Sequence, residues 1–264
     1  MASPRPLFIF LQGLDGTGLS LQAQLGGLDL LFNVRCLSIS HSNRSGWDEL
    51  TEQTATLIKV EQDRCPGQMT IICGESFGGC LALSLFSRFP DLCDQLILVN
   101  PASSARQQLW IHPCSVLSRF LPEPLYKLST HSLCDLLIAS HRVCKPMKRR
   151  LLSAMQSMGP ENAAWRLSLL RQFNVDDLVV HRPLQSTLIL VSGADRLLPS
   201  RSEASRLTRF LPGARTLVLP QSGHVCLLEN QINLLAILQS HADGADRPVS
   251  FQAVGSDQSA VAFR

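Results

Sequence analysis

Short hydrophobic runs alternate with segments of helical spacing along most of this chain. Each run holds four to six mostly apolar residues and predicts a buried strand; the runs are 7–11, 34–39, 69–73, 96–99, 187–191 and 216–219. After the second run, the spacing of apolar residues from Trp47 predicts an amphipathic helix with Ser45 as its N-cap. A further helix is predicted from Phe77 to Phe89, because Pro90, the next residue, cannot continue a helix.

This alternation is typical of βαβ units, in which helices cover both faces of a parallel sheet. It predicts an α/β fold with a mostly parallel sheet of about six strands. Between Pro101 and Pro183 the strand pattern stops and amphipathic patches replace it, which predicts a helical cap inserted after the fourth strand. The predicted organisation is a core in two pieces, an inserted cap and a flexible C-terminal tail: 1–100 with 183–242, 101–182, and 243–264.

Composition narrows the class of protein. The 264 residues are 45% hydrophobic and 17% charged, which is enough to bury the core of one large domain. A net charge of +3 and an aromatic fraction of 6% argue against a nucleic-acid-binding protein, which needs basic surfaces or stacking side chains. We therefore expect no nucleic-acid partner.

Cysteine usage and hydropathy bear on location. Nine cysteines without a Cys-x-x-Cys pair indicate free thiols in a reducing compartment. No Cys or His residues have the close paired spacing of a zinc site, so we expect no metal and no cofactor. No apolar stretch reaches the roughly 18 to 20 residues that a transmembrane helix needs. These features predict a cytoplasmic protein, soluble or peripheral to membranes.

The first candidate for chemistry follows the third predicted strand. Residues 74–78 read Gly-Glu-Ser-Phe-Gly, a Gly-x-Ser-x-Gly sequence between a buried strand and a helix. Such a turn strains the backbone of the serine, and the flanking glycines avoid clashes with the neighbouring strand and helix. Ser76 is therefore predicted to be a nucleophile. The alternative is a structural turn in an inactive protein.

A serine nucleophile needs a base, and the base needs an orienting acid. Asp195 follows the fifth predicted strand, and His224 follows the sixth. The order Ser, Asp, His is the one that this strand-turn-helix arrangement uses. We therefore predict a triad of Ser76, Asp195 and His224. Asp176 and Asp177 are alternative acids, and a structural histidine at a helix N-terminus is the alternative for His224.

The loop after the first predicted strand, residues 11–18, is rich in glycine and lies where a second oxyanion donor is needed. The backbone amides of Leu14 and Phe77 are predicted to form the oxyanion hole. The loop lacks the Lys-Ser/Thr ending of a phosphate-binding P-loop.

Three polar residues near the predicted strand ends are candidates for binding substrate. Gln12 and Asp15 lie in the glycine-rich loop, and His41 follows the second predicted strand. Asp15 has a second interpretation, as a cap with Thr17 for the helix that follows.

Four motifs together resemble the α/β-hydrolase superfamily: Gly13–Gly18, Gly74–Gly79, Leu98–Ala102 and Gly193–Asp195. Within it, the chain is most similar to the hydrolase-like part of the phytyl ester synthase and esterase/lipase/thioesterase family of chloroplasts and cyanobacteria. The resemblance implies acyl transfer from an acyl carrier protein, coenzyme A or a lipid to phytol or diacylglycerol.

These features predict a serine esterase or acyltransferase that acts on lipophilic acyl esters or thioesters, with no cofactor. Apolar cap residues are predicted to line a channel for the acyl or prenyl chain: Leu117, Phe120, Leu121, Leu133, Leu136 and Leu137. Two alternatives remain: a small-molecule hydrolase of the C–C hydrolase or haloperoxidase type, and a non-catalytic binding module. Enzymes with an aspartate nucleophile are excluded, because the elbow residue is Ser76.

Charge is distributed unevenly. Residues 101–182 hold 11 Lys and Arg against 5 Asp and Glu, a net +6, whereas the remainder holds 13 against 16, a net −3. The basic residues of the cap form either a solvated face or a docking site for an acyl carrier protein, a coenzyme A ester or an anionic membrane surface. The candidates are Lys145, Lys148, Arg149 and Arg150.

Overall fold

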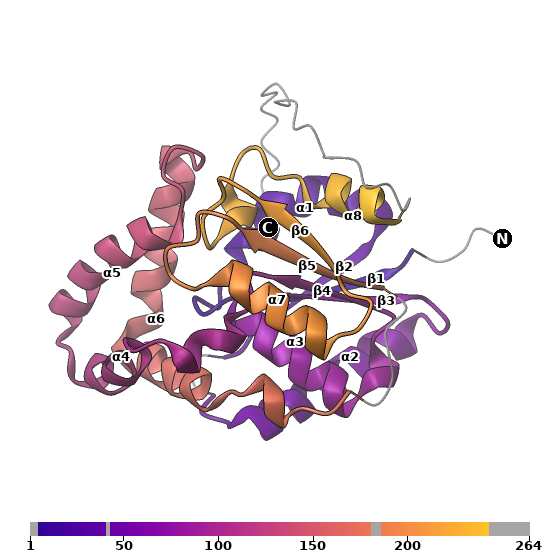
Figure 1. Cartoon of the computed structure of the whole chain (residues 1–264), viewed down its shortest axis with the longest axis horizontal. Coiled ribbons are helices and arrows are strands. Elements are labelled where there is room, and N and C mark those ends of the chain that lie inside the picture. The colour runs from indigo at the N-terminus through magenta and orange to yellow at the C-terminus, as the bar shows by residue number, and fades with distance from the viewer. Residues whose placement is uncertain (1–4, 41–42, 181–185, 243–264) are drawn as a thin grey trace.

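The computed structural model describes residues 5–40, 43–180 and 186–242. Six parallel strands form one sheet in the order β2-β1-β3-β4-β5-β6 (Figure 1). The strands are β1 (Leu7–Leu11), β2 (Asn33–Leu37), β3 (Thr70–Glu75), β4 (Gln95–Val99), β5 (Ser186–Ser192) and β6 (Arg215–Leu219). The strand order reverses direction between β1 and β3. At such a switch point the loops leaving the two strands diverge and leave room for a site.

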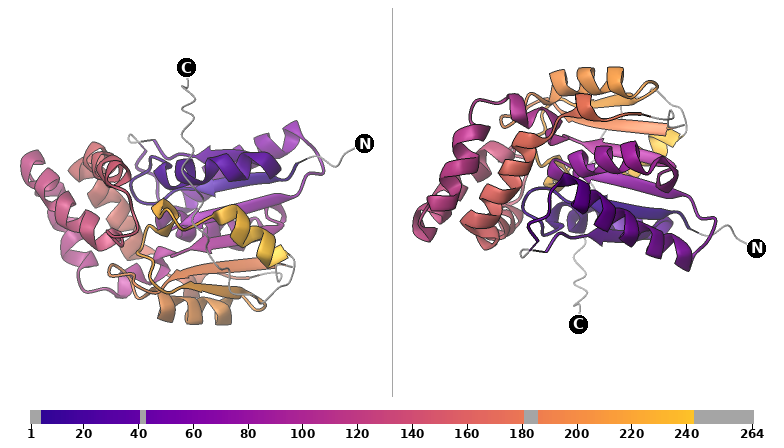
Figure 2. Two further views of the ribbon diagram at one scale, coloured as in Figure 1. Left: turned by 90° about the horizontal axis from the view of Figure 1, so that it is seen from above. Right: turned by 90° about the horizontal axis from the view of Figure 1, so that it is seen from below.

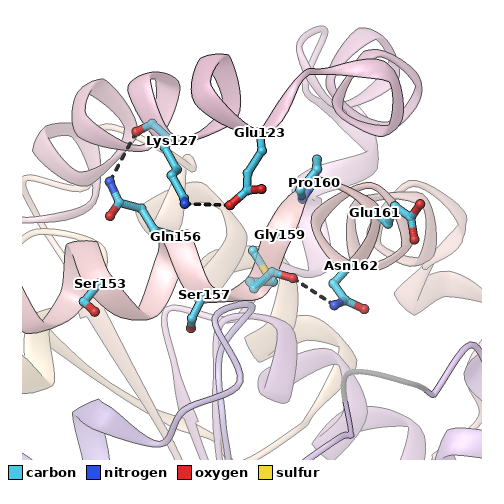
Figure 3. Close-up of a pocket in the computed structure, with 10 residues that line it drawn as sticks. Glu123, Lys127, Ser153, Gln156, Ser157, Gly159, Pro160, Glu161 and Asn162 are labelled. Carbon is cyan, nitrogen blue, oxygen red and sulfur yellow. Dashed lines mark hydrogen bonds and ion pairs between the residues drawn. The ribbon is translucent and has the colours of Figure 1, made fainter.

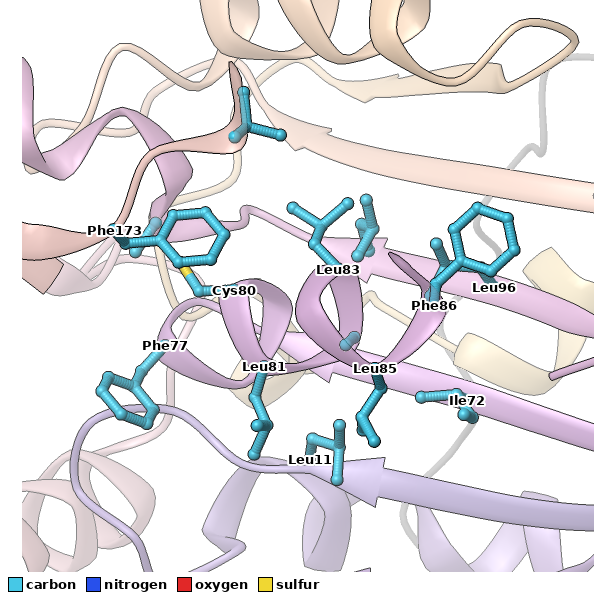
Figure 4. Close-up of a cluster of buried hydrophobic side chains, with 14 of the residues drawn as sticks. Leu11, Ile72, Phe77, Cys80, Leu81, Leu83, Leu85, Phe86, Leu96 and Phe173 are labelled. Atoms are coloured by element: carbon cyan, nitrogen blue, oxygen red, sulfur yellow. The ribbon is translucent and has the colours of Figure 1, made fainter. Parts of the chain in front are cut away.

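Five helices cover the sheet: α1 (Leu19–Leu31), α2 (Trp47–Arg64), α3 (Phe77–Arg88), α7 (Ser200–Phe210) and α8 (Leu234–Ala242). In Figure 1, α1 and α8 lie over one face, and α2, α3 and α7 over the other. Successive side chains of β1 point to opposite faces of the sheet. Leu7, Ile9 and Leu11 therefore pack in the hydrophobic cluster on one face, and Phe8 and Phe10 in the cluster on the other. Figure 4 shows the first cluster around α3. The predicted α/β fold is confirmed.

Between β4 and β5 the described residues, 100–180, form helices and connecting loops without a strand, as predicted. The helices of this segment are η2 (Ala102–Gln107), α4 (Ile111–Leu117), η3 (Ser118–Phe120), α5 (Glu123–Leu137), α6 (Lys145–Gln172) and η4 (Val175–Asp177). Two further short helices lie outside the segment: η1 (Pro90–Leu92), before β4, and η5 (Cys226–Leu228), after β6. Figure 2 shows α4, α5 and α6 beyond the carboxyl ends of the strands. Helix α6 is kinked at Gly159, which has a non-helical φ of 75° and is followed by Pro160.

Two local predictions need comment. Ser45 is not the N-cap of α2, because its amide donates to the Asn43 side chain (2.8 Å) and Gly46 takes the cap position. The predicted tail, 243–264, lies outside the described residues. Within the described part of the chain, no helix is long and apolar enough to cross a membrane.

Candidate active site

The candidate nucleophile lies at the turn from β3 into α3. Ser76 has a left-handed φ of 52° with ψ of −112°, a conformation that non-glycine residues rarely adopt. The flanking glycines are required by close backbone contacts. A Cβ on Gly74 would lie 2.4 Å from the carbonyl oxygen of Gly78, and a Cβ on Gly78 would lie 2.0 Å from that of Leu11. The strained turn therefore depends on the motif that predicted it.

The three predicted triad residues meet at the carboxyl ends of their strands. His224 Nε2 lies 2.8 Å from Ser76 Oγ, and His224 Nδ1 lies 2.7 Å from Asp195 Oδ2. The second carboxylate oxygen of Asp195 accepts from the backbone amides of Leu197 (2.8 Å) and Leu198 (3.1 Å). The side chains of His224 and Asp195 are each only 2% exposed. The first distance suits proton transfer between Ser76 and His224, and the second allows Asp195 to orient the imidazole.

Burial and charge act in opposite directions on the acid and the base. Burial disfavours charge on His224, but the charge and hydrogen bond of Asp195 and the charge of Glu75 together outweigh it, so the pKa of His224 is raised above its ordinary value. Burial likewise opposes ionisation of Asp195, yet His224, Ser200 and the Leu198 amide together lower the pKa of Asp195. The site thus favours an ionised Asp195 and stabilises the imidazolium form of His224.

Asn100, a residue of the Leu98–Ala102 motif for which no role was predicted, supports the base. It lies at the end of β4, is fully buried and has a left-handed φ of 42°. Its Nδ2 donates to the backbone carbonyl of His224 (2.6 Å) and to Ser192 Oγ (2.8 Å), while its Oδ1 accepts from the Ser192 amide (2.7 Å). Asn100 therefore ties the His224 loop to β4 and β5. The tolerance of asparagine for positive φ was the only signal in the sequence.

Glu229 supports the same loop from the other side. It is 2% exposed and accepts from the Gly223 amide (2.8 Å) and Ser222 Oγ (2.9 Å), the two residues before His224. Arg142, from the cap, pairs with it at 2.5 Å. This buried carboxylate therefore uses its acceptor positions to hold the backbone next to the base.

The predicted oxyanion loop lies against the nucleophile. A Cβ built on Gly13 would be 3.8 Å from the Cβ of Ser76. Gly16, with a φ of 73°, closes a turn by donating its amide to the Gly13 carbonyl (3.2 Å). Among the described residues, no hydrogen bond uses the backbone N–H of Leu14 or Phe77. Both amides are therefore available to a ligand.

Arg166 was not predicted, although it contacts this loop directly. It lies on α6 of the cap and is 1% exposed. Its guanidinium donates to the backbone carbonyls of Leu14 (2.6 Å) and Ile39 (3.1 Å). A Cβ on Gly16 would lie 2.5 Å from Arg166 Nη1, so a side chain at that position would displace the guanidinium from the loop. The cap therefore helps to define the conformation of the oxyanion loop.

Two further polar residues, one in the oxyanion loop and one next to Ser76, are buried on this side of the site. Glu75, directly before Ser76, is 3% exposed, and burial raises its pKa to about 7. Gln12 is 4% exposed, and its Oε1 lies 3.9 Å from Cys36 Sγ. Glu75 Oε1, Gln12 Nε2 and Arg166 Nε are buried without a hydrogen-bond partner. These unpaired atoms all lie on the oxyanion side of the site.

The remaining candidates lie in different places. Asp15 accepts from the amide (3.2 Å) and the hydroxyl of Thr17, so it forms a turn, while Gly18 takes the N-cap position of α1. His41 lies outside the described residues. Asp176 pairs with Arg206 at 3.4 Å and Asp177 bonds to Asn174 at 2.8 Å, so neither alternative acid joins His224.

Four of the six residues predicted to line an acyl channel face solvent, with exposures of 37% to 73%: Leu117, Phe120, Leu133 and Leu136. For these four the prediction is wrong, whereas Leu121 and Leu137 are partly buried against hydrophobic clusters. A cavity of about 630 Å³ lies at the α6 kink beside α5, with an ion pair between Glu123 and Lys127 on its wall (Figure 3). None of the triad residues lines this cavity.

Sheet order, strained elbow and hydrogen-bonded triad together define an α/β hydrolase. The sequence profile described as the alpha/beta hydrolase fold matches residues 40–231. The chain belongs to this family, as its motifs predicted.

Two relatives and one solved structure show which α/β hydrolases are similar to this chain. The chain is 31% identical over 257 residues to a chloroplastic phytyl ester synthase of Arabidopsis thaliana, covering 89% of this chain and 36% of the relative. It is 26% identical to an esterase of Mycobacterium tuberculosis, covering 71% of this chain and 65% of the relative. The chain thus spans little more than a third of the synthase. Among solved structures, an esterase of Exiguobacterium antarcticum matches with a TM-score of 0.75 and 15% identity over 92% of this chain and 93% of that one. The two proteins therefore share a fold.

Proposed function

We propose that this protein is a serine-dependent esterase or acyltransferase that acts on lipophilic acyl esters or thioesters. The continuous hydrogen-bonded line from Ser76 through His224 to Asp195 carries the proposal, because it supplies a nucleophile, a base and an orienting acid. The names of the two relatives, an ester synthase and an esterase, support the substrate class.

In the first step, Ser76 Oγ attacks the acyl carbonyl carbon while His224 Nε2 takes the hydroxyl proton. The carbonyl oxygen becomes an oxyanion, which accepts from the amides of Leu14 and Phe77. His224 then returns the proton to the leaving alkoxide or thiolate as the bond to it breaks. An acyl-enzyme on Ser76 and a free alcohol or thiol remain.

In the second step, water or an alcohol attacks the acyl carbon and gives its proton to His224. Collapse of the tetrahedral intermediate returns that proton to Ser76 Oγ. The product is a free acid when the nucleophile is water and a new ester when it is an alcohol. We extend the proposal to a long-chain alcohol such as phytol as acceptor, since the synthase relative supports it.

Covalent labelling tests the nucleophile. A fluorophosphonate probe is expected to label the protein, and Ser76→Ala is expected to abolish labelling and to lower p-nitrophenyl ester turnover by about 10⁶-fold. Ser205→Ala, on the exposed side of α7, is the matched control and should keep both. Labelling that survives in Ser76→Ala would contradict the assignment, and absence of a burst of p-nitrophenol in the unaltered chain would favour a binding module.

A product assay separates hydrolysis from transfer. The protein is incubated with a long-chain acyl-coenzyme A and phytol, and ester and free acid are quantified. Ester formation that depends on Ser76 supports transfer, whereas free acid alone removes the synthase interpretation and leaves the esterase. A preference for short over long acyl chains would favour a small-molecule hydrolase.

A further inference from the structure

Exposed apolar side chains are concentrated in one part of the cap. Eight of the fifteen large hydrophobic residues that are exposed in the described part of the chain fall between residues 109 and 136. Isolated exposed leucines are ordinary, but a cluster of this size on a folded domain marks an interaction surface.

Helix α5 carries an apolar stripe that faces away from the protein. Its buried residues, Tyr126, Thr130 and Cys134, recur every four positions and pack toward α6. Leu125, Leu128 and Leu136 lie on the opposite side of the helix by the same periodicity, with exposures of 54%, 67% and 41%. The helix is therefore apolar on both faces, although only one of them is covered within the chain.

The segment that precedes α5 in the chain also exposes apolar side chains. Leu109 is 94% exposed, Leu117 at the end of α4 is 59% exposed, and Phe120 in η3 is 73% exposed. Figures 1 and 2 show α4 and α5 on the side of the cap farthest from the sheet. We call this surface the outer cap face, formed by Leu109, Leu117, Phe120, Leu125, Leu128 and Leu136.

The charge around the outer cap face is positive. Both acids of α5 are already paired, Glu123 with Lys127 at 2.6 Å and Asp135 with Lys148 at 2.5 Å. The cap has a net charge of +6 over residues 101–182, but not all of its cations lie near this face: Arg142 pairs with Glu229, and Arg150 turns toward α1 and donates to Gln22 Oε1 (2.8 Å). Three exposed cations remain close to it: Arg119 in η3, and Lys145 and Arg149, which lie within one turn of Lys148 on α6.

We propose that the outer cap face docks the protein on a lipid bilayer that contains anionic headgroups. Leucine and phenylalanine side chains enter the boundary between headgroups and acyl chains, and the surrounding cations contact the phosphates. A second copy of the chain fits less well, because a symmetric pair would bring the same cations together. Docking would hold the cap, and the site beneath it, against the source of a lipophilic substrate.

Flotation with vesicles tests this proposal independently of catalysis. The full chain carrying Ser76→Ala, which cannot digest the lipid, is mixed with vesicles of phosphatidylcholine alone or of phosphatidylcholine and phosphatidylglycerol in equal parts. We expect binding to the mixed vesicles. The triple variant Phe120→Ser, Leu125→Ser, Leu128→Ser should bind at least tenfold more weakly, and Arg119→Gln, Lys145→Gln, Arg149→Gln should remove the preference for anionic lipid.

A matched control uses exposed apolar residues of the core. Leu30→Ser, Leu31→Ser and Leu57→Ser together remove side chains that are 71%, 43% and 49% exposed, and should leave vesicle binding unchanged. Equal loss of binding in both triple variants, or no loss in the cap variant, would overturn the proposal. So would light scattering that shows a dimer of the unaltered chain and a monomer of the cap variant, since a second copy would then be the occupant. Circular dichroism establishes that each variant is folded.

Discussion

The two sides of the candidate active site differ in their hydrogen bonding. Among the described residues, buried polar side chains next to His224 are hydrogen-bonded within the protein, whereas three buried polar atoms next to the oxyanion loop have no hydrogen-bond partner. Asn100, Glu229 and Ser200 each bond to the base, its loop or its acid. On the other side, Gln12 Nε2, Glu75 Oε1 and Arg166 Nε are unpaired. Burial without a hydrogen bond costs free energy, so the oxyanion side has fewer contacts that fix it.

The two sides also differ in which part of the chain holds them. The acid and the base are fixed mainly by the ends of β4 and β5 and by the loop after β6. The oxyanion loop takes its support from Arg166, a single side chain of the cap. Loss of a contact on the base side should therefore change proton transfer, and loss on the other side should change stabilisation of the oxyanion.

Among changes that leave the nucleophile Ser76 in place, the largest effect is expected from Asp195→Asn. Without the carboxylate, the imidazole of His224 loses its orientation and the charge that stabilises its protonated form, so kcat should fall by about 10⁴-fold. Turnover of a p-nitrophenyl ester measures the change. Asp176→Asn removes an acid that pairs with Arg206 and should have no such effect. Similar losses in the two variants would remove the distinction between Asp195 and the alternative acid.

Arg166→Met tests the oxyanion side. The carbonyls of Leu14 and Ile39 lose their donor, and the amide of Leu14 is expected to leave its position, so kcat should fall by up to about 10²-fold with little change in KM. Arg171→Met, on the same helix, removes an equal charge and serves as the control. A rise in KM with unchanged kcat would show that Arg166 acts on substrate binding and not on oxyanion stabilisation.

Two substitutions of Asn100 distinguish the effect of its hydrogen bonds from the effect of backbone strain on the base side. Asn100→Gly removes its hydrogen bonds but keeps a residue that tolerates a φ of 42°, so we expect roughly tenfold lower kcat and about 2 kcal/mol less stability. Asn100→Ala should lose about 1 kcal/mol more, because alanine resists the left-handed conformation. Denaturant unfolding measures both. Equal stability of the two variants would contradict a role for strain.

The sequence predicted what local pattern and strand order determine. Six apolar runs gave the strands, and the residues after the third, fifth and sixth gave Ser76, Asp195 and His224, because the carboxyl ends of parallel strands share one edge. Arg166 could not be found in this way, since it meets Leu14 across 152 positions of sequence through a cap whose packing no periodicity specifies. The direction of Leu136 was wrong for the same reason. Its apolar character predicted a place in the lining of an acyl channel, but α6 covers the other face of its helix and Leu136 faces solvent.

The smallest expected change comes from Glu75→Gln, and it joins the two sides of the site. The Glu75 carboxylate raises the pKa of His224, so its removal should lower that pKa. His224 must be neutral to accept the proton of Ser76, and the acidic limb of kcat/KM should therefore move to lower pH. Because burial holds the pKa of Glu75 itself at about 7, it is only partly ionised near neutrality, and the movement should be smaller than that of Asp195→Asn. Glu203→Gln, another buried carboxylate that pairs instead with Arg206, should leave the limb in place. An unmoved limb in Glu75→Gln would mean that the oxyanion side affects catalysis through geometry alone.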